Sequence, residues 1–260
     1  MRWGRRSQSR FRDVRATTNL MSRISRVVVP GVPHHATQRG NGRQVTFVSD
    51  EDRLVYLDLL AKHRRAFGLE VWAWCQMSNH IHLLAVPARE DSLARTLGRT
   101  HAEYAQYWNA RRRSCGHVWQ ARFYSCPVDA DAAWVVARYI ETNPVRVGMT
   151  EAAEQWRWSS ARAHVMGRDE FALMEWSAWA GEYDGWRWQE VLRSGVLDEA
   201  WQRRLEEATI RGRPMGSEPF VEALERQLGC RLRPQRAGRP AKRGEAKDRE
   251  QRQTVMEIVN

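Results

Sequence analysis

Residues 69–87 constrain the fold most strongly, because they predict two neighbouring strands. The runs "LEVWAWCQM" (69–77) and "HIHLLAVP" (80–87) are rich in apolar and β-prone side chains, and only Ser78 and Asn79 separate them. A connection this short joins antiparallel strands, since parallel strands need a long crossover. The sequence therefore predicts an antiparallel sheet that contains this pair.

The other predicted elements give the order strand, helix, strand, strand, helix, strand, followed by a third helix. They are a strand over 33–39, a helix over 49–68 capped by Ser49 or Asp50 and stopped by Gly68, a helix over 91–112, a strand or irregular hairpin within 117–128, and a helix over 129–145 that Pro144 stops. This order predicts an α+β fold, an antiparallel sheet with helices packed on one face, of the ferredoxin-like or RNA-recognition-motif type.

The chain divides into four predicted regions. Residues 1–20 are basic and aperiodic, which predicts a disordered arm or a mis-annotated start before Met21. The main domain covers 21–165, and a mostly helical C-terminal extension follows over 166–230. Its last two helices, the second over 217–228, predict either a helix-turn-helix-like DNA-binding unit or a packing appendage. Residues 231–260 predict a basic, disordered tail that contacts nucleic acid.

The charge of the chain favours a nucleic-acid partner. Its 42 Lys and Arg exceed its 31 Asp and Glu, for a net charge of +11, and the basic residues are mostly arginine, which binds phosphate through two hydrogen bonds. A merely basic soluble protein is the alternative. No apolar run is long enough to span a bilayer, which predicts a cytoplasmic, nucleoid-associated protein with no membrane partner. The four cysteines show no C-x-x-C spacing, so reduced thiols are expected.

Two histidines on the second strand of the pair predict a metal site. Residues i and i+2 of a strand share a face, so His80 and His82 project together while Ile81 and Leu83 point into the core. Two adjacent imidazoles can hold one divalent metal ion and leave room for other ligands. A hydrogen-bonded or exposed histidine pair is the alternative.

A tyrosine and an asparagine in "ARYIETNPVRVGM" are the candidates for the rest of this site. Tyr139 and Asn143 are four residues apart and lie one above the other if both are helical, although Pro144 disfavours the helical conformation at Asn143. Beside the histidine strand, Asn143 can give the metal an oxygen ligand, and Tyr139 can point its phenol at a metal-bound phosphate. An ordinary half-buried tyrosine is the alternative.

Three motifs, "CQMSNHIHLLAVP", "HVWQARFYSCPVD" and "RYIETNPVRVGM", resemble in order and spacing those of the REP-associated tyrosine transposases, which are single-tyrosine transposases of the HUH nuclease superfamily. The opening "PGVPHHATQRGN" is also similar to their first strand and turn. The resemblance covers about residues 21–165. It implies that His80 and His82 bind a metal ion, that Tyr139 is the nucleophile, and that Asn143 stands where related enzymes have a third ligand. Some relatives have glutamine at that position.

The function that this resemblance implies is a metal-dependent transposase and endonuclease that cleaves and rejoins single-stranded or hairpin DNA. The target is a repetitive extragenic palindrome, and the intermediate is a 5′-phosphotyrosine. Mg²⁺ or Mn²⁺ is the implied cofactor, since a phenol with an ordinary pKa near 10 needs help as a nucleophile. Further candidate contacts to DNA are arginines near the site, namely Arg39, Arg43, Arg122, Arg138 and Arg146.

Two other functions remain open. A non-catalytic DNA-binding protein could keep the same fold, but such a protein would be expected to lose His80, His82 or Tyr139, and all three are present. A replication initiator or relaxase of the same superfamily often carries two catalytic tyrosines or a helicase domain. The single candidate tyrosine after the histidines and the missing helicase motifs argue against this function. The protein is expected to act as a monomer or a homodimer.

Overall fold

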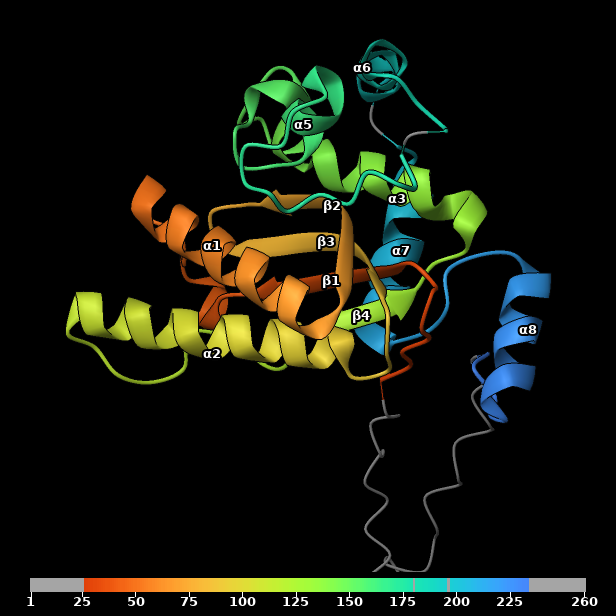
Figure 1. Ribbon diagram of the computed structural model, residues 1–260, viewed down its shortest axis with the longest axis horizontal. Coiled ribbons are helices and arrows are strands. Elements are labelled where there is room, and N and C mark those ends of the chain that lie inside the picture. The colour runs from red at the N-terminus through yellow and green to blue at the C-terminus, as the bar shows by residue number, and fades with distance from the viewer. Residues whose placement is uncertain (1–25, 180, 196, 234–260) are drawn as a thin grey trace, which may run out of the picture.

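A four-stranded antiparallel sheet forms the centre of the molecule (Figure 1). The computed structural model describes residues 26–179, 181–195 and 197–233. The predicted N-terminal arm (1–20) and nearly all of the predicted basic tail (231–260) lie outside these residues. The strands are β1 (His34–Arg39), β2 (Leu69–Gln76), β3 (His80–Pro87) and β4 (Tyr124–Pro127), in the order β2-β3-β1-β4. The predicted α+β class and the predicted antiparallel pair are confirmed.

The helices occur in three groups along the chain. Two long helices, α1 (Asp50–Phe67) and α2 (Ser92–Arg112), lie in the first half of the chain. The middle contains α3 (Ala130–Glu141), α4 (Asn143–Arg146) and α5 (Ala161–Met166), and the C-terminal part contains α6 (Gly185–Arg193), α7 (Glu199–Arg211) and α8 (Glu218–Leu228). Short 3-10 turns occur at Asn41–Arg43 and Ala153–Gln155. None of the helices in the described ranges is both long and apolar enough to cross a membrane.

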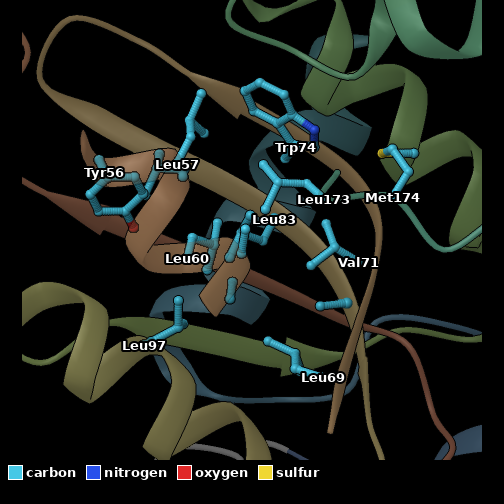
Figure 2. Packing of buried hydrophobic residues seen from close by; sticks show 14 of the residues in the cluster. Tyr56, Leu57, Leu60, Leu69, Val71, Trp74, Leu83, Leu97, Leu173 and Met174 are labelled. Atoms are coloured by element: carbon cyan, nitrogen blue, oxygen red, sulfur yellow. The ribbon is translucent and has the colours of Figure 1, made fainter. Parts of the chain in front are cut away.

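Helices cover both faces of the sheet, so the expectation of a single covered face is wrong. On one face, α1 and α2 pack over a core that includes Leu60, Val71 and Leu83 (Figure 2). On the other face, α3 packs on β2 and β3, and α7 packs on β4 and β1, over a second core that includes Leu84. The reason is that β3 is apolar on both sides after His82, and two apolar faces both require cover.

Local sequence signals fix the first helix as expected. The Ser49 hydroxyl accepts a hydrogen bond from the Asp52 amide, and the Asp52 carboxylate accepts one from the Ser49 amide, which completes a capping box. The helix ends at Gly68, whose φ of 64° is a left-handed conformation that glycine adopts without strain. β2 begins at the next residue, so this glycine sets the angle between α1 and the sheet.

The outer edge of β2 is covered by the chain on either side of α5, namely the Trp-rich segment just before this helix and the loop after it. The Gln76 amide donates to the Trp158 carbonyl, and the Ser160 amide donates to the Trp74 carbonyl. Further along the edge, the Glu175 amide donates to the Val71 carbonyl. An uncovered edge strand invites pairing with other chains, so these two segments close the sheet.

The last two helices pack on different parts of the molecule. α7 lies on the sheet, whereas α8 contacts the segment before β1, where Leu224 packs with Val27 and Val29. The two helices therefore each have their own packing partners (Figure 1). α7 belongs to the predicted extension but packs on the sheet of the predicted main domain. The division of the chain into these two domains remains a prediction.

Candidate active site

The histidine face of β3 is open at one end and closed at the other. His80 is half-buried and His82 is 6% exposed, while Leu84 on the same face is fully buried in the second core. Ile81 and Leu83 lie in the core on the opposite face, as strand alternation predicts. The two imidazoles therefore stand where the second core gives way to solvent.

A cleft of about 450 Å³ begins at this point. Its walls come from strands β1, β3 and β4 and from helices α3, α4 and α7. The lining side chains are those of His35, Thr37, Arg39, His80, His82, Gln120, Tyr124, Tyr139, Asn143, Arg146, Val147, Glu206, Thr209 and Ile210. The structure thus brings His80, His82, Tyr139 and Asn143, together with two of the five predicted arginines, to one cleft.

Tyr139 lies directly across from the histidines. It is on the buried side of α3, and its ring centroid is 5.8 Å from that of His82, with the two ring planes perpendicular. Its hydroxyl donates a hydrogen bond of 3.0 Å to the Glu206 carboxylate. Burial raises the pKa of the Tyr139 phenol above its usual value and the Glu206 charge raises it further, while Arg146 partly opposes this rise. The phenol is therefore protonated near neutral pH, and Glu206 is the group placed to take its proton.

Asn143 reaches the cleft from a separate short helix. α3 ends at Glu141, and Asn143 is the first residue of α4, so the expectation of one continuous helix through Asn143 is wrong. The cause is Pro144, which has no amide hydrogen and crowds the residue before it. Asn143 still contacts the preceding turn, because its Nδ2 donates to the Tyr139 carbonyl at 3.1 Å. Its Oδ1 accepts from the Arg146 guanidinium at 2.5 Å.

Both histidines of the pair have their Nδ1 atoms engaged. The Nδ1 of His80 is 2.7 Å from the Asn79 side-chain oxygen, and the Nδ1 of His82 is 2.9 Å from the Nε2 of His35. The Nε2 atoms of His80 and His82 have no hydrogen-bond partner among the described residues. They are also not among the fully buried polar atoms that lack a partner. The two free Nε2 atoms are therefore open to the cleft.

The electrostatic state of the pair suits a metal ion. Burial, together with Arg39 and Arg146, lowers the pKa of His80 to about 4, and burial, His80 and His35 hold the pKa of His82 well below its ordinary value. Both rings are thus neutral at pH 7, the form that binds metal. Within the described ranges, no group of three or more His, Cys, Asp or Glu side chains is arranged to hold a metal ion. Two imidazoles with amide, water or phosphate oxygens could hold a divalent ion here. The choice of Mg²⁺ or Mn²⁺ remains a prediction.

The five predicted arginines separate into two groups. Arg39 and Arg146 line the cleft. Arg138 donates to the Gly195 carbonyl in the loop after α6, while Arg43 and Arg122 are exposed and do not line the cleft. A role of any of these arginines in binding DNA stays a prediction.

Eight residues of the cleft were not among the sequence candidates, and three of these have polar contacts that bear on the site. His35 lies on β1, and Glu206 and Thr209 lie on α7. A signal for His35 exists, because His35, Thr37 and Arg39 alternate along a strand and so share a face. Pairing of β1 with β3 puts that face beside the histidine pair. Glu206 and Thr209 belong to a helix whose own sequence gives no hint of where it packs.

The antiparallel sheet presents two histidines across a cleft from a tyrosine on a helix. This is the arrangement expected of the single-tyrosine, two-histidine class that the motifs resemble. Residues 31–143 match the model of the IS200-like transposase family. The matched part of the chain contains β1 to β4 as well as α3. The match ends before α7 begins.

Two solved structures are similar to the chain. A REP-associated tyrosine transposase bound to a REP hairpin is 19% identical, with a TM-score of 0.46, and the alignment covers 61% of this chain and 96% of that one. A presumed transposase from Deinococcus radiodurans R1 is also 19% identical, with a TM-score of 0.33, covering 45% of this chain and 94% of that one. A search of curated proteins found no match.

Proposed function

We propose that the protein is a metal-dependent DNA transposase that cleaves and rejoins single-stranded or hairpin DNA through a phosphotyrosine intermediate. The observation that carries this proposal is the position of Tyr139 across one cleft from His80 and His82. The match of residues 31–143 to the model of the IS200-like transposase family supports it. The choice of a repetitive extragenic palindrome as the target follows from the sequence motifs.

The charges around the cleft favour a phosphate. Arg39 and Arg146 flank the histidines, and the whole chain carries a net charge of +11. The Arg146 guanidinium donates a hydrogen bond to the Asn143 side-chain oxygen. A phosphate that draws Arg146 away would free this oxygen, so Asn143 is the third candidate ligand for the metal.

The proposed chemistry uses the phenol and its carboxylate neighbour. Tyr139 Oη attacks the scissile phosphorus while its proton passes to Glu206, to which it is already hydrogen-bonded. The new O–P bond forms as the bond to the 3′ oxygen breaks, and that oxygen takes a proton from water. The products are a 5′-phosphotyrosine and a free 3′-hydroxyl. A divalent ion held by the two Nε2 atoms would offset the charge that develops on the phosphate. A later attack by a 3′-hydroxyl reverses these steps and rejoins the strand.

Covalent capture of DNA tests the proposal. The protein is incubated with labelled hairpin DNA from the host's repeats and Mg²⁺ or Mn²⁺, and adducts are resolved on a denaturing gel. The wild type is expected to form an adduct that Tyr139→Phe does not form. His80→Ala and His82→Ala are expected to abolish cleavage and retain most hairpin binding, because contacts to phosphates dominate affinity.

Tyr124 supplies a matched control, because it lines the same cleft from β4. Tyr124→Phe is expected to keep forming the adduct. An adduct that persists in Tyr139→Phe and disappears in Tyr124→Phe would reverse the assignment of the nucleophile. Hairpin binding without any adduct, with every hairpin and both metals, would favour the non-catalytic DNA-binding protein instead.

A further inference from the structure

We propose that His35 and Thr209 are positioning residues that fix the tautomer of His82, so that its Nε2 lone pair faces the metal position. This inference rests on the proposed function, because it assigns a purpose to the histidine pair. It concerns a chain of hydrogen bonds that runs from α7 through β1 to β3. All three side chains line the cleft, and His35 belongs to the opening segment "PGVPHHATQRGN".

The first link is in α7. The Thr209 hydroxyl donates to the carbonyl oxygen of Leu205, one turn earlier in the same helix, at 2.7 Å. A hydroxyl has one proton, so towards any other group Thr209 acts as an acceptor. Its other partners are the Nδ1 of His35, at 2.8 Å, and the Sγ of Cys126, at 3.3 Å. His35 must therefore carry a proton on Nδ1, and Thr209 accepts it.

The second link follows from the surroundings of His35. The ring is 1% exposed, and its two hydrogen-bond partners are a hydroxyl and an imidazole, neither of which is an acid, so the buried ring is neutral and carries a single proton. With that proton on Nδ1, the Nε2 of His35 is an acceptor. Its partner is the Nδ1 of His82, 2.9 Å away, with the two ring planes only 5° apart. Nearly coplanar rings suit an N–H···N bond in the ring plane, and His82 must be its donor.

The third link is the metal position. With its proton on Nδ1, neutral His82 has a bare lone pair on Nε2, the atom that opens to the cleft. His80 reaches the same state by another route, because its Nδ1 donates to the side-chain oxygen of Asn79. Metal-binding histidines usually donate their other ring N–H in this way, which fixes both the tautomer and the ring orientation. His35 itself has both ring nitrogens bonded, so it supports the site without being a ligand.

Two measurements on the full chain test the relay. The first uses ¹⁵N-labelled histidine in metal-free protein and two-bond ¹H–¹⁵N correlations, with the His82 signals assigned from a His82→Gln variant. The wild type is expected to show His82 protonated on Nδ1. In Thr209→Val, the His35 Nδ1–H loses its acceptor. The proton of His35 is then expected to move to Nε2 and that of His82 to move to its own Nε2, which blocks the metal.

The second measurement is Mn²⁺ affinity by calorimetry. Thr209→Val is expected to weaken binding about 10-fold or more, and Thr209→Ser is expected to restore it because it keeps the hydroxyl. Thr100→Val is the matched control, since Thr100 is a buried threonine of α2 whose hydroxyl has no partner among the described residues. This variant is expected to bind Mn²⁺ like the wild type.

The outcomes distinguish the relay from the proposed function. If His82 is protonated on Nε2 in the wild type, the relay is wrong. It is equally wrong if Thr209→Val and Thr100→Val bind Mn²⁺ alike and as tightly as the wild type. A wild type that binds no Mn²⁺ or Mg²⁺ overturns the metal-dependent function, whatever its tautomers. The expected tautomers with a selective loss of affinity in Thr209→Val support both.

Discussion

Replacing His101 should make the protein markedly less sensitive to acid. His101 lies on α2 and is 8% exposed, and its Nε2 is hydrogen-bonded to the Tyr56 hydroxyl at 3.0 Å. Burial lowers its pKa from 6.5 to about 3. The unfolded chain therefore binds a proton at this residue below pH 6.5, whereas the folded chain does so only near pH 3. The free energy of unfolding must fall across this window as the pH falls.

The size of the effect follows from the two pKa values. Between pH 7 and pH 5, preferential protonation of the unfolded state at His101 lowers the free energy of unfolding by about 2 kcal/mol. In His101→Gln this loss disappears, while the glutamine side chain can still offer an oxygen to the Tyr56 hydroxyl. The other buried histidines add to the pH dependence of both proteins, and their contributions cancel in the difference.

Urea unfolding followed by tryptophan fluorescence at pH 7, 6 and 5 measures this difference. The quantity compared is the change in the free energy of unfolding with pH, because the substitution also alters the absolute value. His117→Gln is the control, since His117 is exposed and its replacement is expected to leave the pH dependence as in the wild type. Identical pH dependence in His101→Gln and the wild type would refute the reasoning.

Three further changes test the active site and the packing. Glu206→Gln removes the acceptor of the tyrosine proton and should slow adduct formation about 10²-fold or more, with unchanged Mn²⁺ affinity. The neighbouring Glu207→Gln should react like the wild type. Equal rates in the two variants would exclude Glu206 as the base. Asp52→Asn should lower the free energy of unfolding by about 3 kcal/mol in urea titrations, because the fully buried Asp52 carboxylate pairs with Arg112 at 2.7 Å. A loss below ~1 kcal/mol would contradict this. Trp188→Phe should lower the free energy of unfolding by about 1–3 kcal/mol in thermal unfolding, because it removes the indole N–H that donates at 2.7 Å to the buried carboxylate of Glu141. An unchanged melting temperature would count against this prediction.

Local signals in the sequence account for most of the sheet and its long helices. The capping box at Ser49 and the glycine at 68 set the limits of α1, and the short connection that contains Ser78 and Asn79 sets the antiparallel pair. These signals depend on a few neighbouring residues, so they can be identified without the fold. The number of covered faces was predicted wrongly because it depends on where the helices after β4 return to the sheet.

The candidate site was predictable only where its residues follow strand or helix periodicity. His80, His82 and Tyr139 lie at the cleft as expected, and Asn143 reaches it despite the break before Pro144. His35 could not be placed without the pairing of β1 with β3. Glu206 lies 67 residues after Tyr139 in the sequence, and only tertiary packing brings the two together.

The position of α7 has a consequence for the timing of synthesis. All the motif residues have been translated once the ribosome passes Met149, but the cleft still lacks the wall that carries Glu206 and Thr209. A nascent chain at that stage has Tyr139 without the carboxylate that accepts its hydrogen bond. A chain truncated anywhere between Met149 and α7 would keep every residue of the motifs and still have an incomplete cleft. Under the proposed function, competence to cut DNA would then arise late in translation, after α7 has folded back onto the sheet.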